Sequence, residues 1–473
     1  MRLIVNADTL EIHPPAGAVL LDVLRRDMRL TGVKEGCREG DCGACLALIG
    51  ETNERGEVTW HAVNSCLFPA GDAAGRQIVT IEGLNLEGLT PVQEAIVEEG
   101  ATQCGFCTPG FVIALTGFLL GSPTLTRDDA ELAAAGNICR CTGYDGLRRV
   151  CVRLADRFAD LASLNPSERL AELIRRRVLP AYFSDIPERL RALSLSEAPP
   201  EPPEAEHPVS VGGGTDLFVQ RAEAMEHAPL RFLLRRSDWA GLRREGDDLI
   251  MGGATTVETL VRSDLLAEAV PAMRAAFPLV SSRPIRERAT LAGNLANASP
   301  IGDLTILFLP LDPVLVLRDE SGGVREVPLA AWYLGYKKMD TRPGELVRAL
   351  RFRIPPRSLR YNFEKVSRRE HLDIAAVNSA AAFEMEGDRI LRVRLSAGGV
   401  APVPMRLTGA EAALAGRAPD PDALRAAQEA ADAQIAPIDD VRGSAAYKRA
   451  LLRGLIAAHF AACFPDVFPD PEP

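Results

Sequence analysis

The chain has 473 residues, more than one hydrophobic core normally serves, so we expect about three domains. Hydrophobic residues make up 47% and charged residues 25%, and a net charge of −10 without a basic stretch argues against a nucleic-acid-binding surface. The first residues alternate like a strand and lack the apolar core of a signal peptide, and the longest apolar run, 111–120, is about half of a membrane-spanning helix. We therefore expect a soluble, cytoplasmic protein.

The N-terminal third contains two different hydrophobic periods. Residues 1–83 predict a small β-grasp module, with one helix at 19–24 and alternating apolar residues that indicate strands at 2–5, 10–13, 46–49, 58–63 and 78–81. Residues 84–163 have the helical period instead, and Thr90 with Pro91 marks the first helix start. Further helices at 109–120, 128–135 and 146–162 complete a predicted four-helix domain.

Residues 164–207 are predicted to connect this third to the rest of the chain. Residues 165–193 have a helical pattern and are expected to lie along the surface. Residues 194–208, SLSEAPPEPPEAEHP, are predicted to be extended because their prolines block both helix and sheet. Strands then alternate with helices over 208–356, and a final unit over 357–473 is predicted to have strands at 375–386 and 389–398 and helices at 408–415, 422–433 and 444–463.

The ten cysteines are unevenly placed, since nine of them precede residue 152. A cytoplasmic protein keeps its thiols reduced, so disulfides are not the expected explanation. Cysteines that only stabilise the fold would be spread over every domain. Their clustering therefore points to chemistry confined to the N-terminal third.

The first cysteine set is Cys37-x4-Cys42-x2-Cys45, with Cys66 further along the chain. This is the spacing of plant-type [2Fe–2S] sites. Intervening glycines let the backbone wrap closely round an anionic cluster and turn its N–H groups toward the sulfurs, which helps to set the reduction potential. A structural zinc site also uses four thiolates, but zinc ribbons pair two C-x2-C knuckles, and the four-residue gap does not fit that pattern.

The second set is Cys104-x2-Cys107 with Cys139-x-Cys141. Both pairs precede predicted helices, where the helix dipole favours a negatively charged cluster. Taken alone, this set is equally compatible with zinc.

After the linker, 211–217 reads VGGGTDL, a short strand that runs into three glycines and then a helix start. Such a loop can bring its backbone close to a pyrophosphate, but it is not the G-x-G-x-x-G fingerprint and does not support a Rossmann domain. A second segment, 290–303, is dense in small hydrogen-bonding residues between apolar stretches.

Three segments, KEGCREGDCGAC (34–45), QCGFCTPG (103–110) and GNICRCTGY (136–144), resemble the signatures of the xanthine oxidase family of molybdenum hydroxylases. The resemblance implies an α+β multidomain chain with a ferredoxin-like [2Fe–2S] domain, a helical [2Fe–2S] domain, an FAD-binding domain of the vanillyl-alcohol-oxidase/CO dehydrogenase flavoprotein type, and a small C-terminal α+β domain. In that family the first four cysteines hold the cluster nearer the flavin, and the second four hold the cluster nearer molybdenum. The implied ligands are Cys37, Cys42, Cys45, Cys66, Cys104, Cys107, Cys139 and Cys141. Cys151 and Cys463 match no ligand position and read as buried small apolar residues.

The same resemblance assigns residues to FAD. Thr290 and Asn294 would bind near the phosphates, Asp303 would bind the adenosine ribose, and Lys365 would lie near the isoalloxazine edge. The residues implied to wrap the pyrophosphate are Val211, Gly212, Gly213, Gly214, Thr215, Asp216 and Leu217.

Clusters pass single electrons whereas nicotinamide takes a hydride, and a flavin converts between the two. The resemblance implies that electrons enter from molybdenum, pass the helical-domain cluster and the ferredoxin-like cluster, and leave through FAD to NAD+. No stretch after residue 355 is long enough for a molybdopterin-binding domain, so we expect a large molybdopterin-binding partner subunit in an (αβ)2 heterotetramer, and no catalytic residue on this chain.

Two clusters and FAD on one chain are similar to the small subunit of bacterial xanthine dehydrogenases, which predicts oxidation of hypoxanthine and xanthine to urate by the complex. Two other functions stay open. One is a hydroxylase of the same family that acts on an aldehyde or an N-heterocycle, and the other is a stand-alone iron–sulfur flavoprotein that oxidises NADH. A zinc-binding scaffold is a more remote third.

Overall fold

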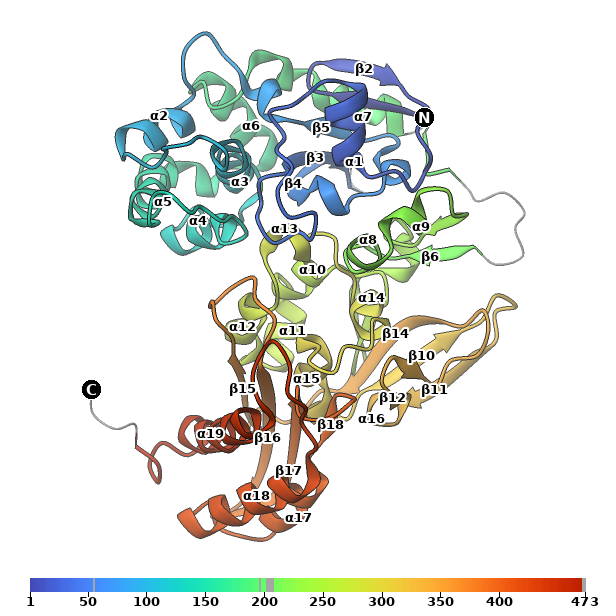
Figure 1. Cartoon of the computed structure of the whole chain (residues 1–473), viewed down its shortest axis with the longest axis vertical. Helices are drawn as coiled ribbons and strands as arrows, with labels where there is room; N and C mark the ends of the chain where they lie inside the picture. Colours follow the sequence, from blue (N-terminus) through green and yellow to red (C-terminus); the bar gives the residue numbers. More distant parts are fainter. Residues whose placement is uncertain (54–55, 195–196, 201–207, 470–473) are drawn as a thin grey trace. The chain divides into compact units, whose positions relative to one another are not determined.

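The computed structural model describes residues 1–53, 56–194, 197–200 and 208–469 (Figure 1). The chain divides into two compact units, and each contains segments that are separate in the sequence. Unit 1 comprises Met1–Leu233 and Ser282–Arg288, and unit 2 comprises Leu234–Ser281 and Ala289–Pro473. No helix among the described residues is long and apolar enough to span a membrane.

The N-terminal part of unit 1 is a five-stranded sheet in the order β2-β1-β5-β3-β4. The central pair β1 and β5 is parallel, and the other pairs are antiparallel. The short helix α1 (Leu20–Asp22) continues as a π-helix over Val23–Asp27. This confirms the predicted β-grasp, with strands β1 Arg2–Val5, β2 Asp8–Glu11, β3 Leu46–Thr52, β4 Val58–Asn64 and β5 Gln77–Val79.

The two faces of this sheet serve different cores, as the alternation of a strand requires. Ala47 and Ile49 of β3 pack into the core that also contains the side chains of α1. Leu46 and Leu48 of the same strand pack into the core of the helical domain. The ferredoxin-like and helical domains are therefore fused through β3.

The four predicted helices are present as α2 (Pro91–Glu98), α3 (Thr108–Gly121), α4 (Arg127–Ala134) and α5 (Asp145–Phe158). Helix α2 begins with a capping box, because Thr90 Oγ1 accepts a hydrogen bond from Gln93 N while Gln93 Oε1 accepts one from Thr90 N. Every residue of α3 from 110 to 120 is buried, which identifies α3 as the central helix of the domain.

Residues 165–193 are helical as predicted, with α6 (Pro166–Arg175), a 3-10 helix (Ala181–Ser184) and α7 (Ile186–Ser194). The expectation that they lie along the surface was wrong, because Leu173, Phe183 and Leu190 are completely buried in the helical-domain core. Residues 197–200 have neither helix nor strand, while 195–196 and 201–207 of the predicted linker lie outside the described residues. The domain boundaries stay a prediction.

Two later segments complete unit 1. The parallel strands β6 (Val209–Val211) and β7 (Leu230–Phe232) flank α8 (Leu217–Gln220) and α9 (Ala222–Glu226), and the short helix α13 spans Arg283–Arg286. Phe218, Met225 and Phe232 pack into the same core as α1, so this βαβ segment shares a hydrophobic core with the ferredoxin-like domain.

Unit 2 begins with a five-stranded antiparallel sheet in the order β11-β10-β14-β9-β8. In the sequence, short helices and one β-hairpin lie between the strands of this sheet. The strands are β8 Leu242–Glu245, β9 Asp248–Gly252, β10 Val314–Arg318, β11 Val324–Pro328 and β14 Leu346–Arg353, with the hairpin β12 Tyr333–Gly335 and β13 Lys338–Met339. The helices are α10 Val257–Val261, α11 Asp264–Ala269, α12 Met273–Ala276, α14 Leu291–Ala296, α15 Asp303–Phe308 and α16 Leu329–Trp332.

The C-terminal part of unit 2 is an antiparallel sheet in the order β15-β16-β17-β18 with three helices (Figure 1). The predicted strands and helices are confirmed, and they share a separate core. Their bounds are β15 Arg360–Val366, β16 Val377–Glu386, β17 Arg389–Gly398, β18 Met405–Arg406, α17 Thr408–Leu414, α18 Pro421–Gln434 and α19 Ala445–Cys463.

One buried histidine makes this C-terminal part sensitive to acid. His459 of α19 is fully buried, with Nδ1 3.0 Å from Asn362 Nδ2 and Nε2 2.9 Å from Ser379 Oγ. Because Asn362 Nδ2 can only donate, the ring is neutral, with Nδ1 accepting and Nε2–H donating. Burial lowers the pKa of His459 to about 3.

The folded-state pKa of His459 lies below that of the unfolded chain, so its contribution to stability is complete above about pH 6.5 and is lost as pH falls toward 3. Between pH 7.5 and 5 we expect this residue to cost about 2 kcal/mol of unfolding free energy. Urea unfolding of the protein and of His459→Gln at both pH values measures the effect. Acid destabilisation should be smaller by that amount in the variant, and an equal loss in both proteins would contradict the assignment.

Candidate cofactor sites

The first thiol set lies in the loop between the π-helix and β3. Cys45 directly precedes β3, and Cys66 lies in a 3-10 helix over Ser65–Leu67 that follows β4. Gly40 and Gly43 have φ of +80° and +66°, a conformation that favours glycine. A Cβ on Gly36 would lie 2.8 Å from Cys42 Sγ, so the loop passes too close to the sulfur for any side chain at this position.

The four thiols of this set lie as two hydrogen-bonded pairs. The bond between Cys37 and Cys42 lowers the pKa of Cys37 to about 5 and raises that of Cys42. In the same way, the bond between Cys45 and Cys66 lowers the pKa of Cys45 and raises that of Cys66. Backbone N–H groups of the loop, including that of Glu39 at 3.4 Å, point to Cys37 Sγ, as the glycine-rich loop predicted. One thiol of each pair, Cys37 or Cys45, is therefore the more acidic of the two.

The second thiol set lies at the ends of two helices. Cys107 is the N-cap of α3, and Cys139 and Cys141 precede α5, as predicted. Cys104 Sγ and Cys141 Sγ are 3.6 Å apart, and Cys107 is hydrogen-bonded to Cys139. Burial, with this bond, raises the pKa of Cys107 to about 12.

Two residues that the sequence reasoning did not assign support this second set. Thr142 Oγ1 donates to Cys139 Sγ at 3.1 Å, and the hydroxyl oxygen of Tyr144 accepts from Cys139 N at 3.0 Å. Tyr144 has φ of +72°, which is strained for an aromatic residue. Both residues belong to the segment CRCTGY, so their place in that motif was the available signal.

The separation of the Cys104 and Cys141 thiols is that of two ligands on one metal ion. Two thiolates on one tetrahedral metal ion lie about 3.7 Å apart, for metal–sulfur bonds of ~2.3 Å. The 3.6 Å separation of Cys104 and Cys141 matches one iron held by two thiolates. Among the described residues, no group of three or more His, Cys, Asp or Glu side chains is arranged to hold a metal ion.

The loops that carry the two thiol sets are in direct contact. Ile138 N donates to Cys42 O at 3.0 Å, and the Nδ2 atom of the buried Asn137 donates to Gly43 O at 3.1 Å. A Cβ on Gly110 would lie 2.3 Å from Gly43 O, so this approach requires a glycine in the first turn of α3.

The glycine loop 211–217 lies in unit 1, between β6 and α8. Gly214 has φ of +82°, and its carbonyl oxygen accepts from Phe218 N at 2.9 Å. Asp216 is the N-cap of α8 but makes no capping hydrogen bond with its side chain. Buried Val211 and Phe218 anchor the two ends of the loop in the core.

Four of the residues assigned to FAD lie in unit 2. The hydroxyl of Thr290 accepts from Gly293 N at 3.1 Å and caps α14. Asn294 lies one turn later, and its Oδ1 atom is buried without a hydrogen-bond partner among the described residues. A buried amide that lacks a partner is costly unless a ligand supplies one, so Asn294 fits a binding role.

Asp303 and Lys365 form an ion pair. Lys365 Nζ donates to Asp303 Oδ2 at 2.8 Å and to Leu279 O at 2.7 Å, and Asn378 Nδ2 donates to Asp303 Oδ1 at 2.7 Å. The family resemblance assigns Asp303 to the adenosine ribose and Lys365 to the isoalloxazine edge. The ion pair places the two side chains in contact, and their roles toward FAD stay predictions.

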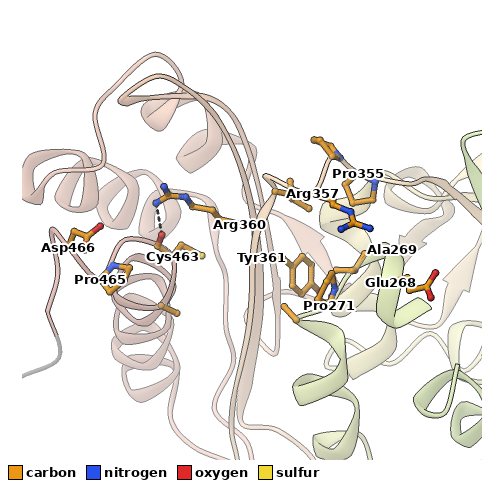
Figure 2. Close-up of a pocket in the computed structure, with 15 residues that line it drawn as sticks. Glu268, Ala269, Pro271, Pro355, Arg357, Arg360, Tyr361, Cys463, Pro465 and Asp466 are labelled. Carbon is orange, nitrogen blue, oxygen red and sulfur yellow. Dashed lines mark hydrogen bonds between the residues drawn. The ribbon is translucent and has the colours of Figure 1, made fainter. Parts of the chain in front are cut away.

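Unit 2 also contains a cavity of about 800 Å³ (Figure 2). Its lining comes from the end of α11, the segment before β15 and the end of α19, with Arg357, Tyr361 and Cys463 among its side chains. Arg360 Nη1 donates to Cys463 O at 2.7 Å across it. None of the residues assigned to a cofactor lines this cavity.

Four family models match successive parts of the chain. They are "2Fe-2S iron-sulfur cluster binding domain" over residues 3–70, "[2Fe-2S] binding domain" over 80–151, "FAD binding domain in molybdopterin dehydrogenase" over 190–356, and "CO dehydrogenase flavoprotein C-terminal domain" over 362–462. The chain is also 42% identical over 153 residues to a probable xanthine dehydrogenase subunit of Bacillus subtilis, and the match covers 32% of this chain and 83% of that protein. This chain belongs to the xanthine oxidase family of molybdenum hydroxylases.

Other members of the family match most of the chain at lower identity. "Xanthine dehydrogenase 1" of Arabidopsis thaliana is 27% identical over 90% of this chain, which spans only 37% of that protein's length. Among solved structures, a Cu,Mo-CO dehydrogenase is 30% identical with a TM-score of 0.52, covering 55% of this chain and 90% of the other. CO dehydrogenase from Hydrogenophaga pseudoflava is 26% identical with a TM-score of 0.53, covering 56% and 91%.

These matches confirm the predicted fold class, the two [2Fe–2S] domains, the FAD-binding domain and the C-terminal domain. The ligand roles of individual residues stay predictions, which the contacts above support.

Proposed function

We propose that this chain is the iron–sulfur/FAD subunit of a xanthine dehydrogenase, with Cys37, Cys42, Cys45 and Cys66 holding one cluster. The second cluster would be held by Cys104, Cys107, Cys139 and Cys141. The observation that carries the proposal is the arrangement of eight thiols as four close pairs in two touching loops. When bound, the clusters would supply single-electron transfer, and FAD would collect electrons in pairs for delivery to NAD+.

Side chains of the helical domain support an electron entry point at the second set. Cys104 and Cys141 are exposed, whereas the first set is half-buried or buried. Exposed aromatic side chains lie close to them in the sequence, with Phe106 47% and Tyr144 39% exposed. An apolar, solvent-facing rim is expected where a partner subunit covers the site. We assign that partner to a molybdopterin-binding subunit in an (αβ)2 heterotetramer.

The residues of this chain would control cluster chemistry through hydrogen bonds and burial. N–H groups directed at the sulfurs stabilise the more negative, reduced cluster, and Thr142 does the same for Cys139. The contact of Ile138 N with Cys42 O holds the two loops at a fixed separation. For FAD, we propose the loop 211–217 around the pyrophosphate, Thr290 and Asn294 near the phosphates, Asp303 at the adenosine ribose, and Lys365 near the isoalloxazine edge.

Xanthine is favoured as the substrate of the complex because relatives named xanthine dehydrogenase align with 84–90% of the chain at 27–28% identity. The solved CO dehydrogenases align with 54–56% of it, and they favour a second candidate, a hydroxylase of the same family with another substrate. A cytoplasmic location is proposed because none of the ten cysteines, all of them among the described residues, forms a disulfide, as in a reducing compartment.

Coexpression with the molybdopterin-binding partner tests the function. We expect the purified complex to contain two [2Fe–2S] clusters and one FAD per chain, and to reduce NAD+ with xanthine. Reduction of NAD+ only with an aldehyde, an N-heterocycle or carbon monoxide would reassign the substrate. NADH oxidation by the chain alone, without any copurifying partner, would support the stand-alone flavoprotein instead.

A further inference from the structure

Arg288 is a buried arginine at the end of the segment Ser282–Arg288 in unit 1. Only 3% of its side chain is exposed. Its Nε atom donates to Gly213 O at 3.0 Å, and its Nη2 atom lies 2.9 Å from Asp72 Oδ2. The guanidinium carbon lies 3.9 Å from the centre of the Phe68 ring, a close cation–π contact.

These contacts join two functional segments that are far apart in the sequence. Phe68 and Asp72 lie two and six residues after Cys66, a proposed ligand of the first cluster. Gly213 is the middle glycine of the loop proposed to wrap the FAD pyrophosphate. A single guanidinium therefore contacts both the cluster segment and the flavin loop. Arginine suits this position because its rigid planar fork can hold two acceptors and stack on a ring at once, which lysine cannot do.

The acidic partner of Arg288 is itself firmly held. Asp72 is completely buried, and its Oδ2 atom also accepts from Arg76 Nη1 at 3.0 Å. Arg76 in turn pairs with Glu51 at 2.5 Å. Because a buried carboxylate cannot be left unpaired cheaply, this network fixes where the Arg288 side chain can lie.

We propose that Arg288 is a positioning residue that sets the separation between the first cluster and FAD. By holding Gly213 O it keeps this carbonyl away from the phosphates, so that the N–H groups of the loop stay available to the pyrophosphate. By holding Asp72 and Phe68 it ties the same loop to the segment of Cys66. The inference rests on the proposed function, since it needs both cofactors.

The test compares Arg288→Met, Arg288→Lys and the control Arg169→Met in the full chain with its cofactors. Arg169 is also buried, but it holds the carbonyl oxygens of Leu161, Ser122 and Ala162 in the helical domain and does not contact the glycine loop. Flash photoreduction of the clusters followed by absorbance gives the rate of electron transfer to FAD, and fluorescence of released FAD gives its affinity.

We expect Arg288→Met to keep its iron and sulfide but to bind FAD about tenfold more weakly, the effect of one lost charge-assisted hydrogen bond. Electron transfer from cluster to FAD should slow by about tenfold or more, because a small displacement of reacting groups has large effects on rate. Arg288→Lys should lie between Met and wild type in both measurements. Arg169→Met should lower the melting temperature with unchanged FAD affinity and transfer rate.

A melting temperature lowered in Arg288→Met and Arg288→Lys, with wild-type FAD affinity and transfer rate, would overturn the inference and leave Arg288 as a structural residue. If Arg288→Met does not fold, the lysine variant decides the question, because it keeps the charge beside Asp72. Failure of the proposed function gives a different result, namely wild-type protein that lacks iron, sulfide or FAD.

Discussion

Cys141→Ala is expected to remove one of the two iron–sulfur clusters and to halve the iron and inorganic sulfide bound per chain. Cys141 Sγ lies 3.6 Å from Cys104 Sγ, and this pair would hold one iron of the second cluster. Xanthine-dependent reduction of NAD+ by the complex should fall below detection, because electrons then have no route from the partner to FAD. Iron analysis, the spectrum of the reduced protein and activity measure the result.

Cys151→Ala is the matched control for this prediction. Cys151 lies in the same domain, and burial raises the pKa of its thiol to about 12, as expected for an inert apolar side chain. Its variant should keep full iron content and activity. Full iron in Cys141→Ala, or loss of iron in Cys151→Ala, would contradict the ligand assignment.

Gly110→Ala is expected to have the second-largest effect, because it places a methyl group where the two cluster loops meet. The new Cβ would lie 2.3 Å from Gly43 O and 2.9 Å from Asn137 Nδ2, and a backbone carbonyl can move aside only if the loop of Cys42 moves with it. We expect a loss of about 1–3 kcal/mol or more in the stability of unit 1. Both clusters should also be released faster on mild heating, as followed by the loss of visible absorbance.

Gly454→Ala provides the comparison for a helical glycine without crowding. No atom lies within 4 Å of a Cβ at this position of α19, so the substitution should stabilise the protein by about 0.5–1 kcal/mol through helix propensity. Equal stability of the two alanine variants would show that the loops can separate freely, and the close approach at Gly110 would then have no role.

Local patterns allowed most of the fold to be predicted. Strand β17, at Arg389–Gly398, has the predicted bounds because alternating side chains and a Gly387 turn define it locally. Strand β2 begins two residues earlier than predicted, because Asn6 adopts φ of +52° and closes a two-residue hairpin turn with Ala7 that the sequence reasoning overlooked. The helices at 165–193 were predicted but misplaced, since an amphipathic pattern does not reveal which core covers its apolar face.

The candidate sites also contain residues that the sequence could predict and contacts that it could not. The cysteines could be predicted as ligands because their spacing is a pattern within short segments. Which thiols lie in pairs could be seen only in the structure. The ion pair of Asp303 with Lys365 joins positions 62 residues apart, and the contact of Arg288 with Gly213 joins positions 75 apart. No local pattern encodes such contacts, and they emerged only from the structure.

The segment Ser282–Arg288 belongs to unit 1, although the residues before and after it belong to unit 2. This arrangement constrains how a gene for such a protein can be divided. The polypeptide passes between the units after Leu233, before Ser282 and after Arg288. A break in the linker before residue 208 would turn the contacts of Arg288 with Asp72 and of Glu287 with His61 into contacts between separate polypeptides. Gene fission at this point would therefore preserve the buried network only if the two products reassembled, whereas fusion makes its formation independent of protein concentration.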